Sequence, residues 1–128
     1  MKNITTVTRY SLVCVALILG GCASVDNIAP YRISDNSAVV ALADEAYALA
    51  SLEKYDQAKS KIERALRMEP KNAALWLELA RINKFQGDYD DALNLALRAK
   101  SLTQEPRLEE NIQLFIDELM VHDYSHSF

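Results

Sequence analysis

A repeat with a period of 34 residues constrains this chain more than any other feature of its sequence. The residues that recur are, in pairs, Ala46 and Ala80, Tyr55 and Tyr89, Ala58 and Ala92, and Ala65 and Ala99. A fixed period of a few tens of residues is typical of architectures in which one small supersecondary unit stacks on the next. The sequence therefore predicts a short array of similar units, with a first copy around Tyr55 and a second copy around Tyr89.

The spacing of apolar residues within each copy predicts helices. Trp76, Leu79 and Ala80 follow one another at i, i+3 and i+4, which places them on one helical face. The second helix of that copy shows the same spacing, with Ala92, Leu95, Ala96 and Ala99. The chain has 3 Gly and 3 Pro among 128 residues, too few for the many tight turns of an all-β fold. We therefore expect an all-α domain.

Helix ends are marked by a few residues. Asn72 precedes the run from Ala73 to Phe85 and is a suitable N-cap, while Gly87 can adopt a positive φ and end that helix. The first copy has Glu53 where the second has this glycine. The first copy therefore departs from the second at this turn.

These positions resemble the tetratricopeptide repeat. The second copy matches the family's spacing at Trp76, Leu79, Ala80, Gly87, Tyr89, Ala92, Ala96 and Ala99. The first matches at Leu42, Ala46, Leu49, Tyr55, Ala58, Ile62, Ala65 and Pro70. Glu45, Asn83 and Glu53 depart from the family's Leu, Tyr and Gly. The resemblance implies two helical hairpins that form a short α-solenoid.

A further helix is expected from Glu105 to Val121, because two repeats alone leave an apolar face uncovered. Its apolar stripe consists of Leu108, Ile112, Phe115 and Leu119. We therefore expect a repeat domain with a C-terminal capping helix over residues 37–121, followed by a flexible tail over residues 122–128. Six acidic residues oppose Arg107 between Glu105 and Asp123, and we expect these charges to solvate the helix.

The N-terminus has the pattern of a secretory signal. Lys2 and Arg9 precede the apolar run Leu12–Leu19, which ends in Gly20-Gly21-Cys22. This ending resembles the lipobox of bacterial lipoproteins. The resemblance implies removal of residues 1–21 and attachment of diacylglycerol and an acyl chain such as palmitate to Cys22. An ordinary signal peptide or signal anchor with an unrelated cysteine is the alternative.

The segment that follows, residues 22–36, is expected to be a tether, because it contains Pro30 and no helical period. Ala23 rather than Asp follows the cysteine, which in lipoproteins implies delivery to the outer membrane. The expected location is therefore the periplasmic face of the outer membrane.

We expect no catalytic site and no cofactor. No Gly-rich phosphate loop occurs, and Cys22 is the single cysteine left after processing. His122 and His126 lie at i and i+4, but in the expected tail, so we expect no metal site. A net charge of −4 gives no reason to expect nucleic acid.

In the resembled family, the first helix of each repeat lines a concave groove that holds a peptide or a partner helix. By position, Tyr47, Leu77 and Phe85 are candidate apolar anchors for a partner. Arg81 and Lys84 are candidates to meet a carboxylate or an acidic segment. The alternative for Tyr47 and Phe85 is that they pack against neighbouring helices.

The leading hypothesis is a membrane-anchored, non-catalytic adaptor that binds a periplasmic protein. The stretch Ile62–Ala99 also resembles the repeat domain of outer-membrane lipoproteins that activate class A penicillin-binding proteins, which implies regulation of a peptidoglycan synthase. The alternatives are a scaffold lipoprotein for pilus or secretion assembly, and a structural protein that assembles with itself into a homo-oligomer.

Overall fold

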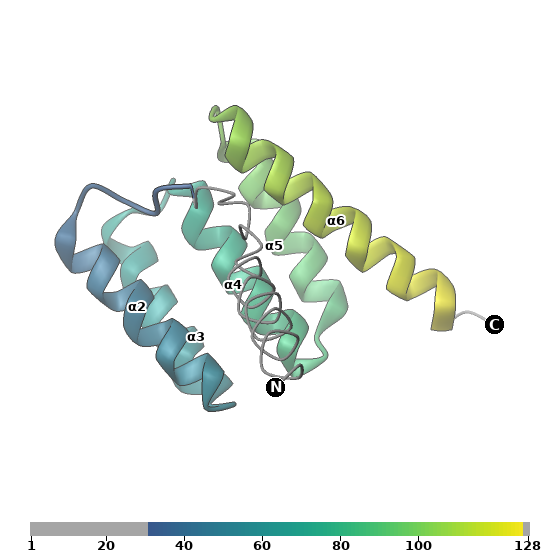
Figure 1. Ribbon diagram of the computed structural model, residues 1–128, viewed down its shortest axis with the longest axis horizontal. Coiled ribbons are helices and arrows are strands. Elements are labelled where there is room, and N and C mark those ends of the chain that lie inside the picture. Colours follow the sequence, from purple (N-terminus) through teal and green to yellow (C-terminus); the bar gives the residue numbers. More distant parts are fainter. Residues whose placement is uncertain (1–30, 127–128) are drawn as a thin grey trace, which may run out of the picture. The chain divides into compact units, whose positions relative to one another are not determined.

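The computed structural model describes residues 31–126, with side chains as far as His122. Every regular element in this range is a helix, which confirms the all-α fold (Figure 1). The helices are α2 (Ser37–Ser51), α3 (Tyr55–Met68), α4 (Ala73–Gln86), α5 (Tyr89–Leu102) and α6 (Pro106–His126). None of these helices has the length and apolar character needed to cross a bilayer. The expected leader 1–21 and Cys22 lie outside the described residues.

The helices form two hairpins followed by a single helix (Figure 1). Helix α2 packs on α3, and α4 packs on α5; α3 also contacts α4, and α6 lies against α5. Outside their own hairpin, α4 thus contacts α3 and α5 contacts α6. This arrangement confirms the two repeats and the capping helix.

Small residues bring the helices of the second hairpin close together. Ala80, Ala92, Ala96 and Ala99 have no exposed surface and belong to one hydrophobic cluster. Large side chains of α6, such as Ile112, complete that cluster. A second cluster fills the first hairpin and extends to α4. The core is therefore continuous from one copy to the next.

Trp76 connects the two clusters, since it packs against both. Its indole Nε1 donates a hydrogen bond of 2.9 Å to the backbone oxygen of Pro70. The guanidinium carbon of Arg98 lies 3.9 Å from the centre of the indole ring, a cation–π distance. Trp76 therefore links the end of the first copy, α4 and α5.

The ends of α4 are as the sequence predicts. The Asn72 side chain accepts a hydrogen bond of 3.2 Å from the Leu75 amide, which satisfies one free donor of the first turn. Gly87 ends the helix with a φ of 88°. Glu53 also has a positive φ, 58°, and closes the first hairpin. An L-residue in this conformation costs about 1–2 kcal/mol, so the first turn is strained and the second is not.

Residues 31–36 were expected to belong to the tether, but they pack on the domain. Tyr31 and Ile33 contact the two hydrophobic clusters. The Ser34 hydroxyl donates to Glu69 Oε1 at 2.7 Å, and Asn72 Nδ2 donates to the Ile33 oxygen at 2.7 Å. The predicted boundary at residue 36 is therefore too late.

Helix α6 also differs from its predicted bounds, since it continues through His126 instead of ending at Val121. No Gly or Pro follows Pro106 in this helix, so no residue interrupts the backbone hydrogen bonds. The expected flexible tail over residues 122–128 thus begins, in the described residues, as helix.

Substitutions at Gly87 and Glu53 should have opposite effects on the stability of the fold. Gly87→Ala should lower the free energy of unfolding by about 1 kcal/mol through backbone strain alone, because a Cβ at this position meets no atom within 4 Å.

Glu53→Gly should raise the free energy of unfolding by about 0.5 kcal/mol, because relief of strain exceeds the entropy that glycine loses on folding. Urea denaturation followed by circular dichroism measures both, and Glu53→Ala controls for loss of the side chain. A Glu53→Gly variant less stable than Glu53→Ala would contradict the assignment of strain to this turn.

Candidate functional site

A pocket of 280 Å³ lies between α4 and α6. Its lining residues are Arg81, Lys84 and Phe85 from α4, and Asn111, Leu114, Phe115 and Glu118 from α6. We call it the α4–α6 pocket. Because its two walls come from successive units of the array, the pocket exists only when α6 is in place.

The apolar walls of the pocket are accessible to solvent. Phe85 and Leu114 are each 63% exposed. Phe85 is held by a parallel stack with Tyr55, whose ring centre lies 6.1 Å away. Large exposed apolar side chains beside a cavity are a common feature of protein-binding surfaces. These two residues are the most accessible apolar contacts that the pocket offers.

The two cations of the pocket already have anionic partners. The Lys84 ammonium pairs with the Glu118 carboxylate, and it lies 5.7 Å from the centre of the Phe115 ring. Arg81 Nη1 lies 3.6 Å from Glu78 Oε1. The charges around the pocket thus balance within the domain. An acidic partner, as the sequence suggested, must break one of these pairs to bind.

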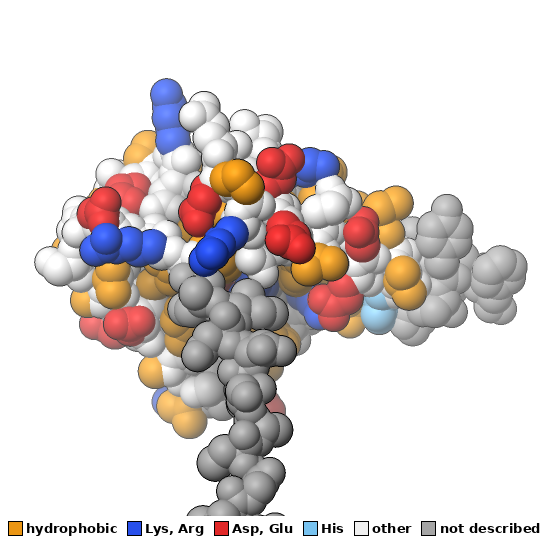
Figure 2. All heavy atoms as spheres, turned by 45° about the horizontal axis from the view of Figure 1, so that its top comes forward, with side chains coloured by type: hydrophobic (Ala, Val, Ile, Leu, Met, Phe, Trp, Pro, Cys, Tyr) orange, Lys and Arg blue, Asp and Glu red, His pale blue; other side chains and the backbone are white. Residues whose placement is uncertain are grey.

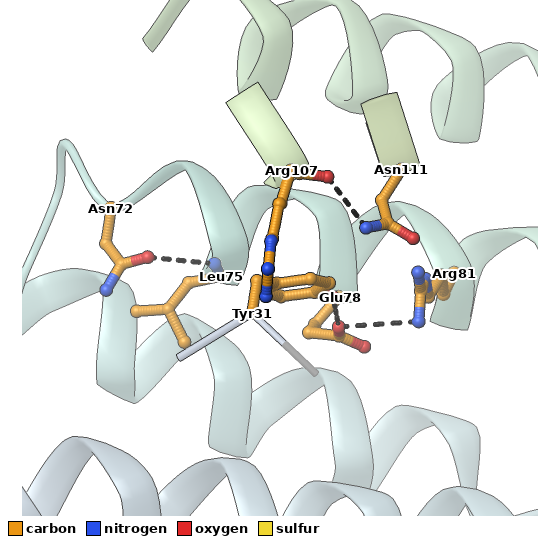
Figure 3. A network of polar contacts seen from close by, with 7 residues as sticks. All are labelled: Tyr31, Asn72, Leu75, Glu78, Arg81, Arg107 and Asn111. Carbon is orange, nitrogen blue, oxygen red and sulfur yellow. Dashed lines mark hydrogen bonds and ion pairs between the residues drawn. The ribbon is translucent and has the colours of Figure 1, made fainter. Parts of the chain in front are cut away.

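Glu78 is the most unusual residue near the pocket, because its carboxylate is buried, with 2% of the residue exposed. Figure 3 shows Tyr31 and Arg81 converging on it. The Tyr31 hydroxyl donates a hydrogen bond to Glu78 Oε1, and the Arg81 guanidinium lies 6.0 Å from the centre of the Tyr31 ring. A buried charge is tolerated only with such partners. Tyr31 therefore fixes the segment before α2 to the middle of α4.

Burial and the Glu78 carboxylate raise the pKa of Tyr31 above its usual value. The same two causes, in the same order, raise the pKa of Tyr47. Each phenol is more costly to ionise here because the phenolate would lose hydration and face a carboxylate. Both hydroxyls thus remain donors over the whole neutral range.

The structure brings together three of the five candidate partner-binding residues. Arg81, Lys84 and Phe85 line the α4–α6 pocket. Tyr47 is 44% exposed on α2 but is not a lining residue. Leu77 has no exposed surface, so its assignment as an anchor for a partner is wrong. Leu77 belongs to the cluster that α6 completes, and it stabilises the fold instead.

Sequence reasoning missed the contribution of α6 and the role of Glu78. Asn111, Leu114, Phe115 and Glu118 form one wall of the pocket, whereas the sequence indicated only a cap. Glu78 carried a usable signal, since it is the single charge within the apolar run from Ala73 to Ala80. A charge in such a run is buried, and a buried charge requires partners.

The described residues contain no group of three or more His, Cys, Asp or Glu side chains arranged to hold a metal ion. His122 lies on α6, where its ring stacks on Tyr89 with 3.9 Å between the ring centres. The side chain of His126 is outside the described part. The available geometry therefore places His122 in a packing contact at the start of α5.

The raised pKa of Tyr31 predicts how stability depends on pH. A group whose pKa is higher in the folded state stabilises the fold fully below its unfolded pKa, near 10, and loses this contribution as pH rises above it. The free energy of unfolding should therefore fall as the pH rises above about 10, and Tyr31→Phe should reduce that fall. At pH 7 the variant should lose about 1–3 kcal/mol, because Glu78 loses a donor. Urea denaturation across this pH range measures both effects.

Tyr55→Phe is the control for this experiment, because it leaves the bond between Tyr31 and Glu78 intact. If the two variants show the same pH dependence, the Tyr31 hydroxyl does not contribute as we describe.

Comparison with known families agrees with this geometry. The family model described as tetratricopeptide repeat matches residues 49–109, from the last turn of α2 into the first turn of α6. A search of curated proteins finds no match. The matched residues include α3, α4 and α5, whose stacking defines the fold, and the cap that follows them begins within the match. The chain therefore carries tetratricopeptide repeats over residues 49–109, where the family model and the packed helical hairpins agree.

Proposed function

We propose that this protein is a non-catalytic adaptor that binds a protein partner through the α4–α6 pocket. Tetratricopeptide repeats in general serve protein–protein interaction. The observation that carries the proposal is the pair of exposed apolar residues, Phe85 and Leu114, beside a cavity of 280 Å³.

The pocket favours an apolar anchor over a charged one. Its volume accommodates a bulky side chain such as Leu or Phe, and Phe85, Leu114 and Phe115 supply apolar contacts. Burying apolar surface contributes roughly 25 cal/mol per Å², whereas a carboxylate must compete with Glu118 for Lys84. A partner helix or peptide with one large apolar residue fits these conditions.

The second part of the proposal is that the adaptor is anchored to the outer membrane through lipid on Cys22. Support comes from the basic start, the apolar run and the Gly20-Gly21-Cys22 ending of the leader. Since residues 31–36 pack on the domain, residues 23–30 are the remaining tether, and eight extended residues reach at most about 30 Å. This length keeps the partner close to the membrane surface.

Site-specific crosslinking tests the binding site. A photo-reactive amino acid at position 85 should capture a partner in cells. The same amino acid at position 97 should not, because Leu97 is a comparably apolar, 48% exposed residue on α5, outside the pocket. Lys84→Glu combined with Leu114→Ser should abolish capture at position 85. Equal capture from both positions contradicts the pocket as the binding site.

The identity of the captured protein tests the narrower hypothesis. A class A penicillin-binding protein would support regulation of a peptidoglycan synthase, which rests on the resemblance of Ile62–Ala99. A component of a pilus or secretion assembly would favour the alternative scaffold role. Capture of a second copy of the chain would favour self-assembly.

The anchor has its own test. Cys22→Ser should move the protein from the membrane fraction to the soluble periplasmic fraction and abolish incorporation of labelled palmitate, because the thiol is the lipid acceptor. Cys14→Ser is the matched control, since this cysteine lies within the apolar run that is removed. Unchanged membrane association of Cys22→Ser would contradict the lipid anchor and favour an uncleaved signal anchor.

A further inference from the structure

The first hairpin pairs an acidic helix with a basic helix. Helix α2 carries Asp44 and Glu45 and no basic residue. Helix α3 has two acidic residues and four basic ones, which are Lys59, Lys61, Arg64 and Arg67. Lys61 Nζ lies 2.5 Å from Glu45 Oε2 across the hairpin. The hydrogen bond from Lys61, together with its charge, lowers the pKa of Glu45.

Helix α6 is also acidic, and it stands in the same place in the array as the first helix of a repeat. It packs on α5 as α4 packs on α3. Within residues 31–126, however, no helix follows α6 to cover its other side. Leu114 shows the consequence, because it lies 34 residues after Ala80. Ala80 is fully buried in its hairpin, whereas Leu114 is 63% exposed.

The uncovered side of α6 combines apolar and acidic residues. Glu110, Leu114, Asp117 and Val121 follow at i, i+4, i+7 and i+11, so they form one stripe, which we call the outer face of α6. All four are exposed, and Val121 reaches 70%. Figure 2 shows acidic and hydrophobic side chains interspersed over the surface that leads to the histidine on α6.

The charges of this face are not balanced within the described residues. Glu110 and Asp117 form no ion pair there, in contrast to Glu118, which pairs with Lys84 on the pocket side. Asp117 accepts a hydrogen bond of 2.8 Å from Gln113, an uncharged neighbour on the same helix. The outer face thus presents two carboxylates and two apolar side chains to a partner.

We propose that the outer face of α6 docks a basic amphipathic helix of another protein. This helix takes the position on α6 that α3 takes on α2, with apolar residues against Leu114 and Val121 and cations against Glu110 and Asp117. A second copy of α6 fits poorly, because two acidic faces repel each other. The proposal goes beyond the pocket, because the outer face shares Leu114 with the pocket lining but not Glu110, Asp117 or Val121.

A synthetic peptide with the sequence Tyr55–Met68 is a suitable probe, because α3 supplies the basic, amphipathic character that the proposal requires. Its binding to the purified full-length chain in mild detergent is measured by fluorescence anisotropy of a dye on the peptide. The double variant Asp117→Lys, Val121→Asp should weaken binding by at least about tenfold. The matched control, Asp91→Lys with Leu97→Asp on α5, should bind as the unaltered chain does.

Charge reversal makes the test specific. A peptide in which Lys59, Lys61, Arg64 and Arg67 are replaced by Glu should not bind the unaltered chain. It should bind the variant Glu110→Lys, Asp117→Lys, whose circular dichroism spectrum verifies that it folds. These substitutions leave Phe85, Arg81 and Lys84 in place, so capture at position 85 should persist and the two proposals can fail separately.

Three outcomes overturn the proposal. The first is absence of binding of the basic peptide to the unaltered chain. The second is equal binding of the basic peptide to the unaltered chain, to the Asp117→Lys, Val121→Asp variant and to the control variant on α5, which indicates attraction to the net negative charge or exchange with α3. The third is a dimer in sedimentation velocity that Val121→Asp dissociates, which assigns the outer face to a second copy.

Discussion

Helix α4 is packed against α3 on one side and α5 on the other, and the side chains that it buries belong to both hydrophobic clusters. Alanines at positions such as 80 and 96 permit this close approach, because a larger side chain there would separate the helix axes. The burial of α4 leaves few of its side chains accessible, and Arg81, Lys84 and Phe85 are among them. The surface of the protein that can bind a partner is a consequence of this packing.

Glu78 shows how that packing affects charge. A carboxylate in the middle of α4 is buried, and Tyr31 and Arg81 compensate it. Arg81 is thereby paired with a buried carboxylate, and Lys84 is paired with Glu118 across the pocket. Because these two pairs neutralise the cations, the pocket carries less positive charge than Arg81 and Lys84 alone would give it. On α6, by contrast, Glu110 and Asp117 of the outer face form no ion pair within the described residues.

The period of 34 residues and the helical spacing were sufficient to predict the paired helices, the cap and the turn at Gly87. The positive φ of Glu53, 58°, was not predicted, because the sequence indicated only that this residue departs from the glycine of the second copy. Leu77 was misassigned because periodicity identifies an apolar face but not the element that covers it, and here α6 covers it. Tyr31 could not be placed, since its contact with Glu78 joins residues 47 positions apart. The lipid on Cys22 remains a prediction.

The α4–α6 pocket spans the junction between two successive units of a solenoid. Such arrays bend and twist by small rotations of one unit against the next, so the width of the pocket varies with the curvature of the array. The pair between Lys84 and Glu118 bridges the same junction. A partner bound at the proposed site would contact both units at once, and would therefore restrict the rotation of one unit against the other.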